Sequence, residues 1–397
     1  MRIDGDEFPG TRIKRSVTPS APLDGLLVLD MAQFLAGPAA ALQLGDLGAR
    51  VIKIERPGAG DLSRSLYLTD TDIDGHSTLF HAINRNKESL ALDLKNDTHL
   101  KAIRQLITRA DVVIQNFRPG VIERLGLDYD VAKQLNPGVI YGSVSGFGPS
   151  GPWSKLPGQD LLAQARSGVM WLNGTAGSGP MPIGLSVADM LASHVLAKGI
   201  LALLVRRGRT GLGGLIETSL LEVLVDFQFE LLTTHLNDGG RAPRRAAAHG
   251  ANAYLAAPYG VYATRNGHLA LAMTPLDKIE ALLDLPGLAS ADGFADRDSL
   301  LDRIAGRVAE RTTEDWLALL EPAGIWAAPV LDWPALLAAE SFQALGMLQN
   351  IRTASGTVKT TAAPFRIDGA RPTFGRGAPG IGEQSRDICE EFGLDLG

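Results

Sequence analysis

Short apolar runs alternate with amphipathic stretches from residue 22 to residue 150. The runs are rich in Val, Ile and Leu, as buried strands are, and the stretches between them have the period of a helix. This alternation predicts right-handed βαβ units, a parallel sheet and therefore a doubly wound, Rossmann-like α/β domain. Strands are expected at 26–30, 50–55, 90–95, 111–116 and 139–144, with one helix that begins near Pro38 and another over 99–109.

The pattern changes after residue 150. Two strongly apolar stretches, 190–206 and 215–235, predict long helices buried against several partners. Further on, two alternating runs flank Asn266-Gly267, which is a hairpin signal. Helices to about residue 320 and a strand near 325–331 would complete a small α+β domain. A strand over 356–365 and a helix from Gly382 are expected to return the chain to the large domain.

These patterns predict five parts of the chain, in which both chain ends contribute to the large domain. They are an N-terminal arm (1–21), a first large-domain segment (22–212), a linker helix and loop (213–258), a small domain (259–332) and a return to the large domain (333–397).

Composition narrows the choice of partners and location. Hydrophobic residues make up 45% of the 397 residues, which is enough for a large core, and the net charge of −6 argues against nucleic acid as a partner. Cys389 is the single cysteine, so no internal disulfide forms, and a reducing cytoplasm is the expected location. The first residues lack the apolar stretch of a signal peptide, and the best candidate span, 195–205, is short and contains Lys198. We therefore expect no membrane partner.

Several motifs that bind nucleotides or metals are missing. The chain has no P-loop, no HExxH, no GxSxG and no GxGxxG after the first predicted strand, and its seven histidines lack the spacing of metal ligands. No metal site is expected. Arg56, Lys95 and Arg124 instead lie at or just beyond the carboxyl ends of predicted strands, where ligands of open parallel sheets bind. These cations would suit the phosphates of a nucleotide-like ligand, although ordinary solvated surface charge explains them as well.

Two aspartates each precede a predicted helix. Asp189 comes just before the first long apolar helix, and Asp160 precedes a shorter helical stretch. Each is placed to cap the helix by accepting hydrogen bonds from free backbone N–H groups. Asp189 is alternatively a carboxylate nucleophile that forms a covalent acyl intermediate, and the pair could share acid–base work. The spacing leaves these roles open.

The chain resembles the class III CoA-transferases, a family that includes formyl-CoA transferase, carnitine CoA-transferase and α-methylacyl-CoA racemase. The likeness runs from about Pro22 to Leu394. It rests on the order of its segments: LDGLLVLDMAQFLAGPAAALQLGDLGARVIKIERPGAGD, NRNKESLALDLK, ADVVIQNFRPGVIERLGLDY, NPGVIYGSVSGFGPSGP, GQDLLAQARSG, RTGLGGLIETSLLE, PYGVYATRNGHLALA and GIGEQSRDICEEFGL.

The resemblance implies an interlocked homodimer of two ring-shaped chains, with CoA bound on the large domain. It assigns CoA contacts to Phe34, Leu35, Arg56, Leu92 to Lys95, Asn116, Phe117, Arg118 and Arg124. It also makes Asp189 the essential nucleophile, which passes through an aspartyl anhydride and an enzyme–CoA thioester while CoA moves from an acyl-CoA donor to a carboxylic acid. CoA thioesters are substrates in this chemistry, and no metal or organic cofactor is required.

Departures from the family pattern bear on the reaction. The racemases have histidine before the aspartate equivalent to Asp160, whereas this chain has Gln159, which is no base near pH 7. Leu35 and the segment 254–257 differ from the formyl-CoA transferases, which have glutamine and a glycine-rich loop there. Transfer between two acids is the favoured function. An α-carbon racemase or isomerase and a non-catalytic CoA-binding protein remain as alternatives.

The identity of the two acids is open. The segment 237–258 is expected to help line the acyl pocket, with Arg241, Arg244 and Arg245 as partners for a substrate carboxylate. Exposed charges on a mobile loop are the alternative interpretation of these arginines.

Overall fold

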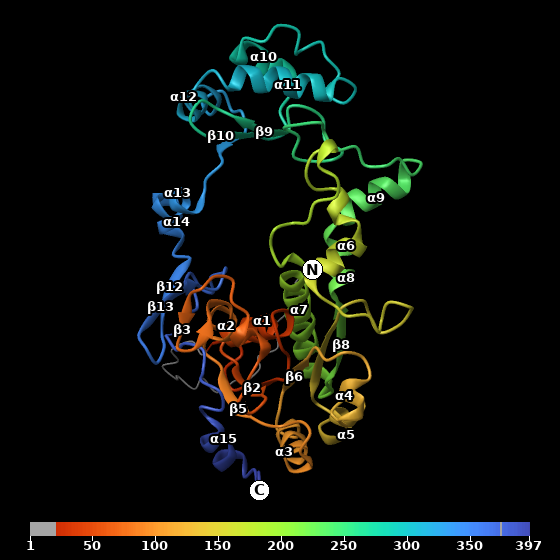
Figure 1. Ribbon diagram of the computed structural model, residues 1–397, viewed down its shortest axis with the longest axis vertical. Helices are drawn as coiled ribbons and strands as arrows, with labels where there is room; N and C mark the ends of the chain where they lie inside the picture. Colours follow the sequence, from red (N-terminus) through yellow and green to blue (C-terminus); the bar gives the residue numbers. More distant parts are fainter. Residues whose placement is uncertain (1–20, 374) are drawn as a thin grey trace, which may run out of the picture.

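A six-stranded parallel sheet forms the centre of the large domain (Figure 1). The computed structural model describes residues 21–373 and 375–397, so almost all of the expected N-terminal arm lies outside the described residues. The strand order is β5-β2-β1-β6-β7-β8, with every neighbouring pair parallel. The strands are β1 (Leu27–Asp30), β2 (Arg50–Glu55), β5 (Glu88–Ala91), β6 (Val112–Gln115), β7 (Ile140–Ser145) and β8 (Gly214–Ser219). The predicted parallel α/β class is confirmed.

Hydrophobic side chains cover both faces of this sheet. Successive residues of a strand point to opposite faces, so Val28 joins one core cluster while Leu27 and Leu29 join the other. On the first face lie α1 (Ala36–Asp46), α6 (Asp160–Ser167), α7 (Val187–Thr210) and α8 (Leu220–Phe227). On the second lie α3 (Asp97–Ile107), α4 (Val121–Arg124), α5 (Tyr129–Leu135) and the C-terminal α15 (Ser385–Phe392). The two ends of the chain therefore share one core, since Ile388 of α15 packs with β5 and β2 residues.

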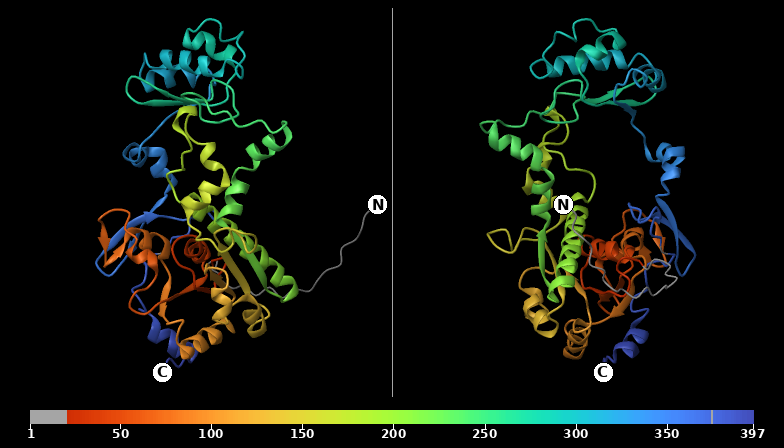
Figure 2. Two further views of the ribbon diagram at one scale, coloured as in Figure 1. Left: turned by 45° about the vertical axis from the view of Figure 1, so that its right-hand side comes forward. Right: turned by 180° about the vertical axis from the view of Figure 1, so that it is seen from behind.

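The small domain lies at the opposite end of the molecule (Figures 1 and 2). The hairpin predicted around Asn266-Gly267 is confirmed: β9 (Gly260–Ala263) and β10 (His268–Leu271) pair antiparallel, and β11 (Ala327–Pro329) adds a third strand. Its helices are α10 (Leu276–Leu283), α11 (Arg297–Val308) and α12 (Thr313–Leu320).

Two separate paths connect the small domain with the sheet, so that the described chain has the outline of a ring (Figure 2). One path contains α6, α8 and α9 (Phe229–Asn237), and the other contains α13 (Trp333–Ala338) and α14 (Glu340–Leu345). The remaining elements are α2 (Thr78–Asn84), the short hairpins β3 (Asp72–Ile73) with β4 (His76–Ser77) and β12 (Leu348–Arg352) with β13 (Thr357–Thr361), and the 3₁₀ turns Leu62–Ser65, Val169–Trp171 and Ala176–Ser178.

One predicted element is wrong, and another has different bounds. The stretch 215–235 is not one helix: its first residues form edge strand β8, and α8 and α9 follow with a break at Gln228. Pairing with β7 outweighs the helical pattern there, and it places β8 in the sheet although the first large-domain segment was expected to end at 212. The strand expected over 90–95 ends at Ala91, and a turn follows in which the Asn96 N–H donates to the Asp93 carbonyl. The predicted domain boundaries themselves stay predictions.

Helix α7, with 24 residues, is the longest helix of the described residues. It is also the one helix there that is long and apolar enough to cross a membrane, by length and composition alone. A core helix of a globular protein has the same properties, and Leu196 and Ile200 of α7 are fully buried in the cluster with α1 and β7. The expectation of no membrane partner stays a prediction.

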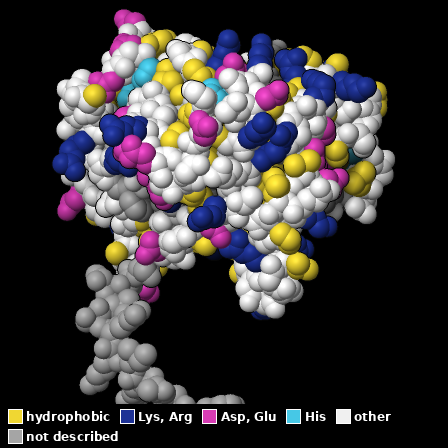
Figure 3. All heavy atoms as spheres, turned by 90° about the horizontal axis from the view of Figure 1, so that it is seen from below, with side chains coloured by type: hydrophobic (Ala, Val, Ile, Leu, Met, Phe, Trp, Pro, Cys, Tyr) yellow, Lys and Arg dark blue, Asp and Glu magenta, His cyan; other side chains and the backbone are white. Residues whose placement is uncertain are grey.

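Charges of both signs are mixed on the end of the large domain. Figure 3 shows this end with Lys and Arg side chains in several groups and Asp and Glu side chains between them. No single basic field covers the face in this view, which agrees with the acidic net charge.

Candidate functional site

Asp189 lies in the first turn of α7, where the N-termini of three helices converge. The helix begins after Ser186, so Asp189 is not its N-cap as one sequence interpretation proposed. Its carboxylate accepts a hydrogen bond from the backbone N–H of Ala36, the first residue of α1. A carboxylate is favoured there because the N-terminus of a helix carries partial positive charge.

Asp160 supplies the cap that Asp189 does not. It begins α6, and its Oδ2 accepts from the N–H groups of Ala188 at 2.7 Å and Asp189 at 3.2 Å. Its Oδ1 accepts from Gln164 Nε2 at 2.6 Å. The two aspartates that the sequence singled out are thus neighbours, and Asp160 caps α7 across space instead of its own helix.

This environment opposes charge on Asp189. Burial is the larger cause and the negative charge of Asp160 the second, and together they raise the pKa of Asp189 to about 7. The Ala36 N–H acts in the other direction because it binds the charged form. A carboxyl group that titrates near neutral pH beside a helix N-terminus is typical of a functional site.

Close backbone contact positions Asp160. A Cβ on Gly158 would lie 2.4 Å from the Cα of Gly146, which directly follows β7. The chain therefore returns from the 147–157 loop directly against the end of β7 before α6 begins. Gln159 precedes α6 and makes no side-chain cap bond.

The predicted CoA-binding cations gather at one edge of the sheet. Arg56 directly follows β2, Arg118 follows β6, and Lys95 comes after β5, all exposed. β2 and β6 flank β1, and β5 lies beside β2; all of these strands are parallel, so their carboxyl ends meet at the same edge of the sheet. Arg124 is exposed at the end of α4.

The other predicted contacts differ in their exposure. Phe34 and Leu35 lie in the loop from β1 to α1, and the Phe34 side chain is 48% exposed. Phe117 is half-buried against the core. Leu92 is 1% exposed, so its side chain belongs to the core and offers no surface to a ligand. Asn116 binds the backbone of Gln33.

A buried group of charged side chains lies beneath the β1–α1 loop and was missed by the sequence analysis. Lys53 Nζ is 2.7 Å from Asp61 Oδ2 and 3.6 Å from Asp30 Oδ2, and Lys87 Nζ is 2.8 Å from the same Asp30 oxygen. Burial lowers the pKa of Lys87 to about 8, although Asp30 opposes this effect. The signal was present in the sequence, because RVIKIE places Lys53 and Glu55 inside an otherwise apolar strand.

Two of the three loop arginines are already bonded within the chain. Arg245 is 8% exposed and donates to the carbonyls of Asn173 and Gly179, and Arg244 pairs with Asp298. The Arg245 guanidinium thus holds backbone of its own chain, and its suggested contact with a substrate carboxylate stays a prediction. Arg241 remains exposed.

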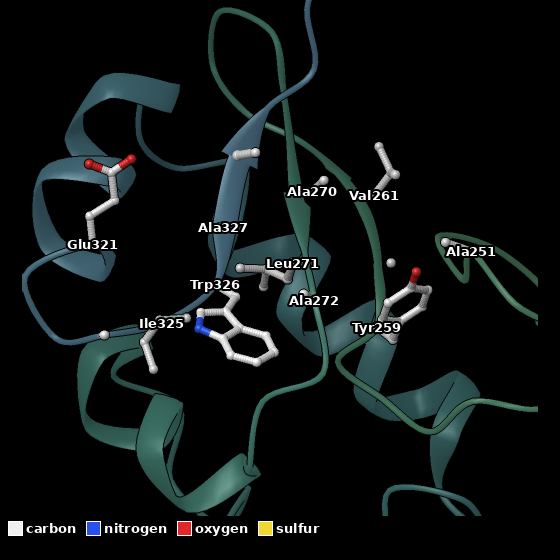
Figure 4. A pocket seen from close by; sticks show the side chains of 13 residues that line it. Ala251, Tyr259, Val261, Ala270, Leu271, Ala272, Glu321, Ile325, Trp326 and Ala327 are labelled. Atoms are coloured by element: carbon white, nitrogen blue, oxygen red, sulfur yellow. The ribbon is translucent and has the colours of Figure 1, made fainter. Parts of the chain in front are cut away.

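A cavity that no sequence motif indicated lies in the small domain (Figure 4). It measures about 560 Å³ and is bounded by β9, β10, β11 and the chain that follows α12. Its lining is mostly apolar, with Tyr259, Trp326 and Glu321 as the larger side chains. All its lining residues fall between 251 and 328, so a single chain does not bring Asp189 to it.

Comparisons with known proteins agree on one family. The model of CoA-transferase family III matches residues 23–385. Succinyl-CoA:glutarate CoA-transferase of Mus musculus is 31% identical, over 93% of this chain and 86% of that protein. Succinyl-CoA:mesaconate CoA-transferase of Haloarcula hispanica is 33% identical, over 94% of this chain and 97% of that protein.

A solved structure extends the agreement to the fold. The crystal structure of a CAIB/BAIF family protein from Brucella suis has a TM-score of 0.82 and 31% identity, and the match covers 94% of this chain and all of that one. The resemblance seen in the sequence is thereby confirmed, and an enzyme is supported over the non-catalytic alternative. The chain belongs to CoA-transferase family III.

Proposed function

We propose that the protein transfers CoA from an acyl-CoA donor to a carboxylic acid, with Asp189 as the group that carries CoA between them. The observation that supports this most is the placement of the Asp189 carboxylate in the first turn of α7, on the Ala36 N–H. This N–H follows directly after Phe34 and Leu35, which belong to the predicted CoA edge.

The proposed reaction proceeds through two covalent intermediates. The ionised carboxylate attacks the donor thioester carbonyl, the C–S bond breaks, and an aspartyl anhydride and CoA thiolate result. The thiolate attacks the aspartyl carbonyl, which gives the enzyme–CoA thioester and releases the donor acid. The acceptor carboxylate attacks this thioester, and the steps run in reverse. Each step exchanges one acyl bond for another, so no redox or metal cofactor is needed.

The geometry supplies electrostatic help for these steps. Each attack places negative charge on a carbonyl oxygen, and the partial positive charge of the helix N-termini that converge at Asp189, those of α1, α6 and α7, favours such charge. The cations that follow β2, β5 and β6 suit the phosphates of CoA. We infer that CoA lies along this edge with its thiol toward Asp189.

The names of the relatives suggest dicarboxylic acids as substrates. The two enzymes compared above are named for succinyl-CoA with glutarate or mesaconate. We therefore propose a dicarboxylic acid as one of the two acids. Succinyl-CoA mixed with glutarate, mesaconate and a monocarboxylic control should give new acyl-CoAs by mass spectrometry. Product formed only from 2-methylacyl-CoA epimers, with solvent deuterium at the α-carbon, would instead establish the racemase alternative.

Asp160 tunes the nucleophile in this scheme, so its charge should set the pH profile. In Asp160→Asn the repulsion is removed and the pKa of Asp189 falls from about 7. Because Asp189 attacks as the carboxylate, the acid limb of kcat/KM should move to lower pH by about one pH unit. Rates measured from pH 5 to 9 check this, with Asp130→Asn in the first turn of α5 as the control. An acid limb of the kcat/KM profile that stays at the same pH or moves to higher pH in Asp160→Asn would contradict the role of Asp160.

We also propose that two chains associate as an interlocked homodimer. Along the path to the small domain, α8 and α9 expose large apolar side chains, with Phe227 52%, Phe229 68% and Leu236 71% exposed. Such a surface is typical of a protein interface. Sedimentation equilibrium should give twice the chain mass of 42.1 kDa at micromolar concentration, and a stable single chain would contradict the proposal.

A further inference from the structure

The loop 31–35 joins β1 to α1 and is held by side chains from other strands. Asn116, which directly follows β6, makes two hydrogen bonds to the loop. Its Oδ1 accepts from the Gln33 N–H at 2.9 Å, and its Nδ2 donates to the Gln33 carbonyl at 2.7 Å. Both amide atoms of Asn116 are therefore engaged within the chain. The side chain is half-buried.

The buried charged side chains described above also hydrogen-bond to this loop, from the side that faces the core. The Ala32 N–H donates to Asp30 Oδ1 at 3.1 Å, and the Ala32 carbonyl accepts from Lys53 Nζ at 2.9 Å. The Phe34 N–H donates to Asp61 Oδ1 at 3.2 Å. These three side chains and Asn116 together bind five backbone polar groups of the loop, which are the N–H and carbonyl groups of Ala32 and Gln33 and the N–H of Phe34.

The conformation of the loop needs such support. Phe34 has a φ of 63°, in the left-handed region that a residue with a Cβ rarely adopts. Conformations of this kind persist only where the surroundings fix them, and they are frequent at functional sites. Leu35 and Ala36 follow immediately, so the path of the loop sets where the first N–H of α1 points.

We propose that Asn116 is a positioning residue whose paired bonds to Gln33 keep the Ala36 N–H on the Asp189 carboxylate. The proposal deepens the function proposed above and rests on Asp189 as its nucleophile. It differs from the role that the family resemblance gives Asn116, which is contact with CoA. In this arrangement Asn116 acts on the nucleophile through the backbone without touching the reacting atoms.

The charged groups around Asp189 make the effect measurable. Asp160 of α6 is the charged side chain that acts on it, and the Ala36 N–H of α1 is the bond that favours its ionised form. If the loop shifts, the Ala36 N–H moves away from the Asp189 carboxylate. The repulsion from Asp160 and the burial of Asp189 then act without this opposing contact, so the pKa of Asp189 rises. Asn116→Leu is a suitable variant, because it removes both hydrogen bonds to Gln33 without adding a charge near Asp189.

The chain offers a matched control at the opposite edge of the sheet. Asn136 precedes β7, is also half-buried, and also holds backbone with both amide atoms, through Nδ2 to Ile107 and Ala110 and through Oδ1 from Gly138. Asn136→Leu removes comparable bonds far from α1. Asn116→Ser serves as the milder second variant, since it keeps a polar side chain at this position and places no apolar bulk against the loop.

The experiment uses the full chain and two readouts. The first is the ¹³C NMR titration of carboxyl-labelled aspartate, with the Asp189 signal assigned by Asp189→Asn. The second is the pH profile of CoA transfer. In Asn116→Leu the Asp189 titration should move up by at least half a pH unit, kcat at pH 7 should fall about tenfold, and KM for acyl-CoA should change less than twofold. Asn116→Ser should show smaller shifts in the same direction, and Asn136→Leu should only lower Tm.

Other results would overturn the proposal. A tenfold rise in KM for each acyl-CoA with an unchanged titration would make Asn116 a CoA ligand. Equal losses of Tm in Asn116→Leu and Asn136→Leu, with unchanged titration and kcat, would reduce its role to stability. If the unmodified protein transfers no CoA, the proposed function fails, while the NMR titration still decides whether Asn116 acts on Asp189.

Discussion

Asp189→Asn should reduce CoA transfer at least about a thousandfold while the protein stays folded. The amide has nearly the shape of the carboxylate, but it cannot attack a thioester or carry CoA, so the covalent route is lost. The loss is measured by incubating each protein with an acyl-CoA donor and a dicarboxylic acceptor and following the new acyl-CoA by mass spectrometry. Hydroxylamine with donor should inactivate the unmodified protein and leave the variant unlabelled.

The thermal stability of Asp189→Asn distinguishes the loss of chemistry from misfolding. The folded-state pKa of Asp189 is raised from 3.8 to about 7, so folding disfavours the ionised form. This destabilisation is absent below pH 4, grows between pH 4 and 7, and is complete above pH 7. At about 1.4 kcal/mol per pKa unit it reaches a few kcal/mol, so Asp189→Asn should raise Tm more at pH 8 than at pH 5.

A matched aspartate tests the specificity of both effects. Asp277 is exposed in the first turn of α10 in the small domain, a helix position similar to that of Asp189. Asp277→Asn should leave transfer and the pH dependence of Tm unchanged. Full transfer activity in Asp189→Asn would end the proposal that this carboxylate carries CoA.

Lys53→Met should lower the free energy of unfolding by about 3–5 kcal/mol, the cost of removing one partner from a buried ion pair. Lys53 is 1% exposed, and its ammonium is the partner of Asp61 and also lies near Asp30. Burial acts to lower the pKa of Lys53, but these carboxylates and Glu55 outweigh it and raise the pKa. The methionine would leave Asp61 charged and without a cation in the core.

Denaturant unfolding and a second substitution test this explanation. Lys101→Met, on the exposed side of α3, should change stability by less than about 0.5 kcal/mol. Adding Asp61→Asn to Lys53→Met removes the uncompensated charge and should restore part of the loss. A Lys53→Met protein as stable as the Lys101→Met control would show that the buried charges do not stabilise this fold.

The sequence predicted the elements of the large domain well where strand and helix patterns differ clearly. The strand 50–55 is observed at its predicted bounds, and the first-domain strands and helices that were predicted are present, with shifted ends. The segment from Leu215 was misjudged because an apolar edge strand followed by helices reads as one apolar stretch. Its pairing with β7 connects residues about 70 positions apart, a contact that local periodicity does not contain.

The candidate site was predicted in its members but not in its contacts. Asp189, Asp160 and the strand-end cations were named from position and family resemblance. The bond from Ala36 to Asp189 and the cap from Asp160 join residues far apart in the sequence, so spacing gave no measure of them. The buried charged side chains around Lys53 were overlooked because charged residues are expected at the surface unless they are paired. Their pairing with aspartates becomes visible only in the three-dimensional structure.

The docking of α15 beside β5 has a consequence for the order of events during synthesis. On the face of the sheet that carries Leu90, the core is completed by Ile388, which is translated only after the whole small domain. The small domain draws its hairpin and helices from a continuous stretch and is ready to fold earlier. Domains usually fold in the order in which they emerge. Here the large domain, whose translation begins first, stays incomplete until a segment beyond the small domain has emerged, and part of its apolar face is uncovered during that interval.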